Sequence, residues 1–179
     1  VRTTIRSLSR EAEVRAAIGR LSDAGDRLEV VAADLTSDVG WAEAAAGCTG
    51  VLHVASPFFA SANEAEMVGP ARDGALRVLR AALAAGAERI VMTSSTQAAS
   101  YPLSPPPLPW DESVWSDPAN PAMNPYGRSK TLAERAAWDF MEQEGARERL
   151  TVVLPGAVLG PVLGRDYSFS LTIVERMLK

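Results

Sequence analysis

The fold is indicated by the stretch Gly50-Val51-Leu52-His53-Val54-Ala55, a short apolar run typical of a strand buried inside a sheet. From residue 63 to 85 the apolar residues recur at helical spacing, with Pro70 expected to kink or restart the helix and Gly86 placed to end it. A second apolar run follows at 89–94. Two buried strands joined by a helix predict a right-handed crossover and parallel pairing.

The same alternation of strand and helix extends outward in both directions. We expect further strands at 1–6, 28–33 and 150–154, and further helices capped by Ser9 and by Ser37, over 124–144 and over 167–179. The Ser9 helix is expected to bury a stripe of Val14, Ala17, Ile18 and Leu21. The pattern predicts an α/β domain, a doubly wound parallel sheet with helices on both faces and one long ordered loop over 101–125.

Composition and charge exclude several classes of function. The net charge of −4 argues against a nucleic-acid surface, and no apolar run approaches the length of a membrane span, about 20 residues. No signal-peptide pattern is present, so we expect a cytoplasmic protein. Cys48 is the only cysteine, which leaves no cysteine metal cluster, and His53 is the only histidine, in an apolar run where a core role is favoured over a catalytic triad.

Ligands of doubly wound sheets bind where the strands end at their carboxyl edge. Four strand ends carry polar or charged groups there, and the fifth runs into a proline and a glycine that open the backbone to close approach. These ends are Arg6, Asp34-Leu35, Ala55-Ser56-Pro57, Thr93-Ser94-Ser95 and Leu154-Pro155-Gly156-Ala157-Val158.

The expected helix at 124–144 begins with Tyr126-Gly127-Arg128-Ser129-Lys130. Its helical spacing places Tyr126 and Lys130 one turn apart on one face. A nearby ammonium favours the phenolate and lowers the tyrosine pKa, as a tyrosine needs before it can exchange a proton near neutral pH. A solvated surface pair is the alternative that spacing alone leaves open.

Ser95, Tyr126 and Lys130 in this order, with Asp34-Leu35 and Val51-Leu52-His53-Val54-Ala55-Ser56-Pro57 before them, resemble the extended short-chain dehydrogenase/reductases. These enzymes belong to the NAD-dependent epimerase/dehydratase superfamily. The run from Tyr126 to Trp138 is most similar to the dihydroflavonol-reductase-like branch, which acts on aldehydes, ketones and related carbonyl compounds. The resemblance extends from Arg2 to about Ser170.

The resemblance implies an NADP(H)-dependent oxidoreductase that reduces a small-molecule carbonyl. Tyr126 would protonate the carbonyl oxygen as hydride arrives from the nicotinamide, Lys130 would hold the ribose and depress the Tyr126 pKa, and Ser95 would hydrogen-bond the oxyanion. Ser94 is the alternative to Ser95. The implied cofactor contacts are Arg6, Asp34 and Leu35 at the adenosine end, Val54, Ala55 and Ser56 in the middle, Pro155, Val158 and Ser170 near the nicotinamide, and Thr93, Tyr126 and Lys130.

Arg6 matches the arginine that meets the 2′-phosphate in NADP-dependent relatives, so NADP is favoured over NAD. A second basic residue of some relatives is Glu13 here, and Arg10 could substitute for it. An exposed strand-end arginine without a ligand is the other reading of Arg6, and it keeps NAD open.

The resemblance also implies a central strand and a glycine-rich, phosphate-binding turn before the first strand, and neither occurs in these 179 residues. We therefore expect residues 1–179 to be a partial domain that lacks this element and most of the substrate-binding region. As an isolated product it should be poorly soluble and bind cofactor weakly or not at all.

Two other functions remain open: a nucleotide-sugar epimerase or dehydratase, and a cofactor-binding regulator without chemistry. Dehydratases commonly place an acid near the serine, where this chain has Thr96, Gln97 and Ala98, and regulators usually lose the tyrosine or lysine. The apolar surface of the helices at 71–85 and 125–144 is compatible with a homodimer, although their small residues also suit simple packing on a sheet. The aromatic residues of the long loop, Tyr101, Trp110 and Trp115, are expected either to wall the substrate pocket or to form local core.

Overall fold

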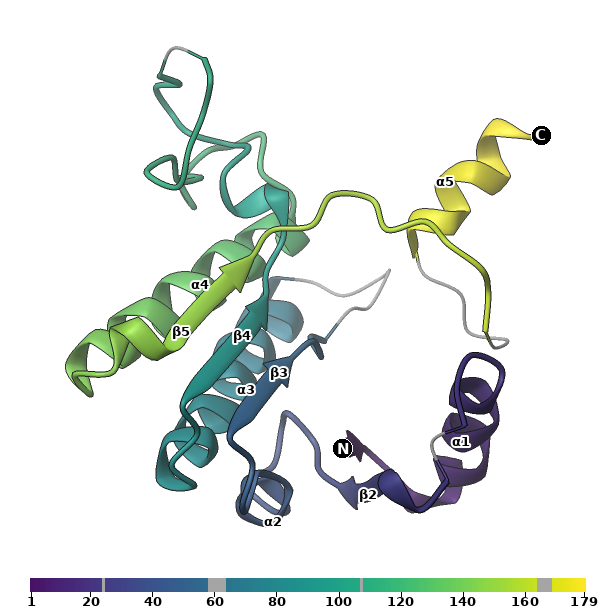
Figure 1. Cartoon of the computed structure of the whole chain (residues 1–179). Helices are drawn as coiled ribbons and strands as arrows, with labels where there is room; N and C mark the ends of the chain where they lie inside the picture. The colour runs from purple at the N-terminus through teal and green to yellow at the C-terminus, as the bar shows by residue number, and fades with distance from the viewer. Residues whose placement is uncertain (24, 58–63, 107, 164–168) are drawn as a thin grey trace.

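The computed structural model of the chain describes residues 1–23, 25–57, 64–106, 108–163 and 169–179 (Figure 1). Its strands form two parallel sheets, a pair β1–β2 and a triple in the order β3–β4–β5. The strands are β1 (Arg2–Ile5), β2 (Glu29–Ala32), β3 (Gly50–His53), β4 (Arg89–Thr93) and β5 (Leu150–Val153). The predicted parallel α/β architecture is confirmed.

Helices connect successive strands, which is why the pairing is parallel. They are α1 (Glu11–Gly19), α2 (Trp41–Ala45), α3 (Glu64–Ala84), α4 (Pro125–Gln143) and α5 (Phe169–Met177), with short 3-10 turns η1 (Leu8–Arg10), η2 (Gly25–Arg27), η3 (Thr96–Ala98) and η4 (Arg147–Arg149). Pro70 lies inside α3, and Gly86 ends the connection with φ +77, a left-handed conformation that favours glycine. Tyr167 and Ser168, where the last helix was expected to begin, lie outside the described residues.

The main core lies between the β3–β4–β5 sheet and the pair α3 and α4, which cover one of its faces (Figure 1). Alanines on both helices are buried and let the backbones approach closely, so the larger Leu79, Ile90 and Met141 fill the remaining space with no exposed area. This packing holds the first turn of α4 against the end of β4.

The β1–β2 pair is attached to this core through α2 and α3. Ala33, Trp41 and Val78 form a second apolar cluster, and Leu35 packs against its edge. The indole Nε1 of Trp41 donates to the carbonyl oxygens of Asp34 at 3.1 Å and Ser37 at 2.9 Å. The end of β2 is therefore anchored to α3.

The expectation that β3 is buried on both faces is wrong for the described residues. Val51 and His53 face α3 and α4, whereas Leu52 is 74% and Val54 65% exposed on the other side. Side chains alternate between the two faces of a strand, so Leu52 and Val54 lie on the face opposite α3 and α4. Among the described helices, neither α1 nor α5 covers that face (Figure 1).

Both predicted serine caps are also wrong. Ser7, rather than Ser9, begins the first helical segment, and its Oγ accepts from the backbone N–H of Ser9 at 3.4 Å. Ser37 closes a turn by accepting from Val39 N, and Gly40 precedes α2. The residues at the two helix starts are therefore Ser7 and Gly40.

The stripe expected on α1 is only half-buried at Val14, Ala17 and Ile18, and Leu21 is 70% exposed beyond the end of the helix. The β1–β2 pair is too small to cover the whole apolar face of α1. No helix in the described ranges is long and apolar enough to cross a membrane.

Candidate active site

The first turn of α4 and the end of β4 form the centre of the site. Asn124 caps α4 by accepting from Gly127 N through its Oδ1 at 2.7 Å, and Pro125 occupies the first turn, where its missing N–H costs nothing. Tyr126 follows directly, so its position is set by the helix start. The helix predicted over 124–144 is confirmed.

Lys130 lies one turn further along α4 and is 5% exposed. Its ammonium is 5.9 Å from the centre of the Tyr126 ring and donates to the Thr93 carbonyl oxygen at 3.3 Å. Burial lowers the pKa of Lys130 to about 8, against an opposing effect of Glu134. The solvated surface pair is thus excluded: the lysine is buried and directed to the end of β4.

Ser94 and Ser95 follow Thr93, and both are buried. Ser94 N donates to the Val153 carbonyl oxygen at 2.8 Å, which extends the β4–β5 pairing by one residue. Ser95 Oγ accepts from Gln97 N at 3.2 Å and caps η3. The Ser94 side chain lies beside Glu134 on α4, so the two hydroxyls have different surroundings.

The segment after β5 closes this edge of the sheet. Thr96 N donates to the Pro155 carbonyl oxygen at 3.1 Å, which places Pro155 beside the turn that carries Ser95. Further along, Ser170 Oγ on α5 accepts from Val158 N at 3.2 Å. The structure thus groups Thr93, Ser95, Tyr126, Lys130 and Pro155, and separately joins Val158 to Ser170.

The residues expected at the adenosine end lie together where β1 and β2 end. The Asp34 carboxylate accepts from Thr36 Oγ1 at 2.7 Å and Thr36 N at 2.8 Å. These bonds, with a smaller effect of the Arg6 charge, lower the pKa of Asp34. Arg6 is exposed and Leu35 half-buried. The Asp34 carboxylate and the exposed Arg6 guanidinium therefore lie at the same edge.

Val54 and Ala55 are exposed and Ser56 is half-buried after the end of β3. Because β3 pairs with β4, these residues lie beside the end of β4 in the same sheet. The expected middle group thus belongs to the same carboxyl edge as Thr93. Within the described residues, no glycine-rich turn leads from a strand into a helix.

Sequence reasoning missed two residues on α3 that hold the Asp34-Leu35 turn. Arg77 donates to the Leu35 carbonyl oxygen at 2.8 Å and to Asp38 Oδ1 at 2.5 Å. At Gly74 an added Cβ would lie 2.8 Å from Leu35 Cβ, so only glycine permits this approach. The helical spacing of Gly74 and Arg77 was the available signal.

The long loop is fastened through Ser116, which is fully buried. Its Oγ donates to the Gln97 carbonyl oxygen at 2.6 Å and accepts from Tyr101 N at 2.8 Å. Arg135 on α4 donates to the Ser116 carbonyl oxygen at 3.0 Å and lies 5.4 Å from the centre of the Trp115 ring. The loop is therefore ordered against η3 and α4, next to Ser95 and Tyr126, and Trp115 is part of that anchor.

Sequence profiles and curated relatives agree with this geometry. The profile of the NAD dependent epimerase/dehydratase family matches residues 2–179. Tetraketide alpha-pyrone reductase 1 of Arabidopsis thaliana is 36% identical over 98% of this chain and 55% of its own length. Dihydroflavonol 4-reductase of Hordeum vulgare is 35% identical over 96% of this chain and 49% of its own. The chain spans about half the length of these relatives.

Solved structures show the same fold. Vestitone reductase from alfalfa (Medicago sativa) superposes with a TM-score of 0.76 and 31% identity, over 96% of this chain and 53% of that one. The yeast methylglyoxal/isovaleraldehyde reductase complexed with NADPH gives a TM-score of 0.65 and 29% identity, over 90% and 52%.

Parallel strands joined by helices, with the polar groups gathered at their carboxyl edge, define a Rossmann-like α/β fold of the dinucleotide-binding class. Within that class, the chain belongs to the NAD dependent epimerase/dehydratase family, among the extended short-chain dehydrogenase/reductases. Its relatives named above are oxidoreductases.

Proposed function

We propose that the chain is the cofactor-binding part of an NADP(H)-dependent reductase that converts a small-molecule carbonyl to an alcohol. The observation that carries the proposal is the buried Lys130 ammonium, 5.9 Å from the Tyr126 ring and bonded to the end of β4 beside Ser95. The family and the reductase names of the relatives support the same reaction class.

The residues at the strand ends fit such a cofactor. Arg6 offers an exposed cation and Asp34 a carboxylate with lowered pKa where the adenosine would lie. Lys130 offers an ammonium 3.3 Å from the Thr93 carbonyl oxygen, at the edge where the nicotinamide ribose would lie. A cation rather than a free acid at the end of β1 suits a 2′-phosphate, which supports NADP over NAD.

The chemistry assigned to this chain is proton transfer. A bound reduced nicotinamide would supply a hydride to the carbonyl carbon. The Tyr126 hydroxyl donates a proton to the carbonyl oxygen, Ser95 Oγ hydrogen-bonds that oxygen as charge develops on it, and the Lys130 ammonium lies near the Tyr126 ring. The products are the alcohol, the oxidised cofactor and a tyrosinate that takes a proton back from solvent.

We also propose that residues 1–179 form a partial domain, in which a strand outside these residues lies between β1 and β3. Among the described residues, β1 pairs only with β2, and β3 only with β4. A parallel strand between them would join both sheets and cover the exposed backbone edges. The remaining half of the relatives' length would then supply most of the substrate pocket.

The test uses the protein expressed from the whole reading frame that contains this sequence. NADPH consumption is followed against aldehydes, ketones and dihydroflavonol-like compounds, with UDP-sugars as a separate arm. Y126F and K130M should lower kcat by at least about a hundredfold, as expected for loss of acid–base catalysis. Y126F should bind NADPH nearly as wild type does, because its change spares the ribose contact.

K179M is the matched control, because Lys179 is the other lysine of this sequence and forms an exposed pair with Glu175. It should leave turnover unchanged. Unchanged turnover in Y126F would remove the mechanism. Conversion of UDP-sugars without carbonyl reduction would favour an epimerase or dehydratase, and NADPH binding with no turnover in any arm would favour a regulator.

A further inference from the structure

Glu134 is a buried carboxylate that the proposed reaction leaves without a role. It lies one turn beyond Lys130 on α4 and is 4% exposed. Trp138 Nε1 donates to its Oε1 at 3.4 Å, and among the described residues its Oε2 has no hydrogen-bond partner. A buried carboxylate with so few donors is costly unless a positive charge lies near it.

Ser94 faces the same carboxylate from the end of β4. Its Oγ is close enough to favour the charged form of Glu134. Within the described part of the chain, neither Ser94 Oγ nor Glu134 Oε2 forms a hydrogen bond. Ser94 and Trp138 are therefore the polar neighbours that favour the charged carboxylate between α4 and β4, and the geometry of both contacts is poor. The charge available to it is the ammonium of Lys130.

We propose that Glu134 is a positioning residue that keeps the Lys130 ammonium charged and directed to the end of β4. The inference rests on the proposed function for its catalytic meaning, and on the buried pair for its physical basis. Two buried opposite charges one turn apart stabilise each other, and removal of either leaves the other uncompensated.

The groups around the pair agree with this assignment. Burial raises the pKa of Glu134, and Ser94, Trp138 and Lys130 oppose that rise. Burial lowers the pKa of Lys130 to about 8, and Glu134 opposes the fall. His53, at the end of β3, has its pKa lowered to about 4 by burial and by Lys130, so it is neutral near pH 7. Tyr126 is the other titratable neighbour of the ammonium.

Removal of the Glu134 charge should lower the pKa of Lys130. Without the Glu134 charge, Lys130 loses its proton at a lower pH than in the wild type. The alkaline limb of the reduction rate, where the ammonium is lost, then moves toward neutral pH. At acid pH, where Glu134 itself takes a proton, wild type and E134Q converge because both side chains are neutral.

The first measurement needs no turnover. The whole protein without cofactor is labelled at the lysine Cε with ¹³C, and the Lys130 signal is assigned by its loss in K130M. Its titration midpoint should fall by about one pH unit in E134Q, the usual effect of an opposite charge at short range. E142Q is the matched control, because Glu142 is an exposed residue of the same helix. E134D keeps the charge and should recover part of the shift.

The second measurement is the pH profile of kcat/KM. We expect E134Q to be about fivefold less active than wild type at pH 8, and within about twofold at pH 6, which corresponds to the same one-unit shift from a wild-type pKa of about 8. An unchanged lysine midpoint in folded E134Q overturns the inference. If E134Q does not fold, E134A removes the same charge, and an unchanged midpoint in E134A overturns the inference in its place. If wild type shows no Tyr126-dependent turnover, the proposed function fails instead, and the lysine titration still decides the role of Glu134.

Discussion

At the scale of single residues, we expect the choice of cofactor to depend on Arg6. Its guanidinium is exposed at the end of β1 and contributes to the lowered pKa of Asp34 across the β1–β2 pair. The Asp34 carboxylate accepts hydrogen bonds from Thr36 N and Thr36 Oγ1 in the loop that follows it. The cation is therefore the group of this edge that is presented to a ligand, and a phosphate would meet it as a charge-assisted partner.

We predict that R6A raises KM for NADPH about tenfold or more and changes KM for NADH less than about twofold. The loss corresponds to one hydrogen bond to a charged group, about 1.5–3 kcal/mol. Steady-state kinetics with both cofactors measures it. R89A is the control, because Arg89 lies at the opposite end of β4 and bonds the Glu88 carbonyl oxygen. Equal losses for the two cofactors would contradict the 2′-phosphate role.

At the scale of elements, α3 connects the two sheets. Its Gly74 and Arg77 hold the turn after β2, while its alanines pack against the β3–β4–β5 sheet. The edges where we propose that the adenosine and the nicotinamide lie belong to different sheets in the described structure, so we expect this helix to set their separation. A change in α3 should therefore affect cofactor binding without touching the cofactor.

We predict that G74A lowers the free energy of unfolding by about 1–3 kcal/mol, the usual cost of an added group in a packed site. The new Cβ would lie 2.8 Å from Leu35 Cβ and 3.2 Å from its carbonyl oxygen. KM for NADPH should rise while kcat is kept. G69A, on the same helix with no atom within 4 Å of the added Cβ, should be neutral or stabilising by about 0.5–1 kcal/mol. Equal stability of the two variants, measured by urea unfolding, would contradict this packing.

At the scale of the whole molecule, the two sheets are joined on one side only, through α2 and α3. Leu52, Val54 and Val153 are 74%, 65% and 49% exposed, and β1 and β3 each keep an edge unpaired among the described residues. Exposed strand edges and apolar patches of this kind favour association with other chains.

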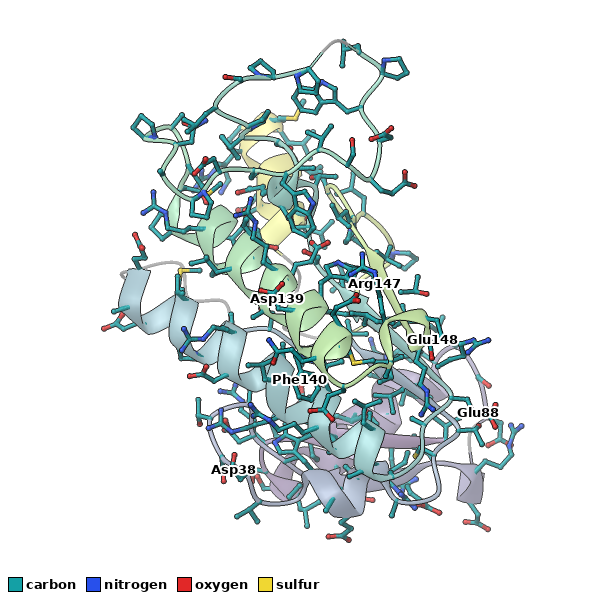
Figure 2. All side chains as sticks on the ribbon, turned by 90° about the vertical axis from the view of Figure 1, so that its left-hand side faces the viewer. Asp38, Glu88, Asp139, Phe140, Arg147 and Glu148 are labelled. Carbon is teal, nitrogen blue, oxygen red and sulfur yellow. The ribbon has the colours of Figure 1, made fainter. Side chains whose placement is uncertain are left out.

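Figure 2 shows the opposite side, where α3 and α4 lie together and Phe140 sits between them, with the Arg80 guanidinium 5.5 Å from its ring centre. A homodimer through this side stays a prediction, as does a cytoplasmic location.

We predict that the isolated 179-residue chain unfolds without a sharp transition and binds NADPH weakly or not at all, whereas the protein from the whole reading frame melts cooperatively and binds it. Circular dichroism melts and NADPH fluorescence titration measure the two properties. The longer protein serves as the control for the assay. A cooperative melt together with tight NADPH binding by the isolated chain would contradict the partial-domain proposal.

The sequence by itself determined the order of strands and helices, the parallel pairing, the long loop and the approximate place of the Tyr126 and Lys130 pair, because all of these depend on local periodicity and on residues one helical turn apart. It did not determine which faces are covered, which serine caps a helix, or that Glu134, Ser94 and Arg77 meet partners far away in the chain. Those depend on how elements pack, because only the tertiary structure brings β4 and α4 close enough to bury Lys130 and Glu134 and to place the Lys130 ammonium at the Thr93 carbonyl oxygen.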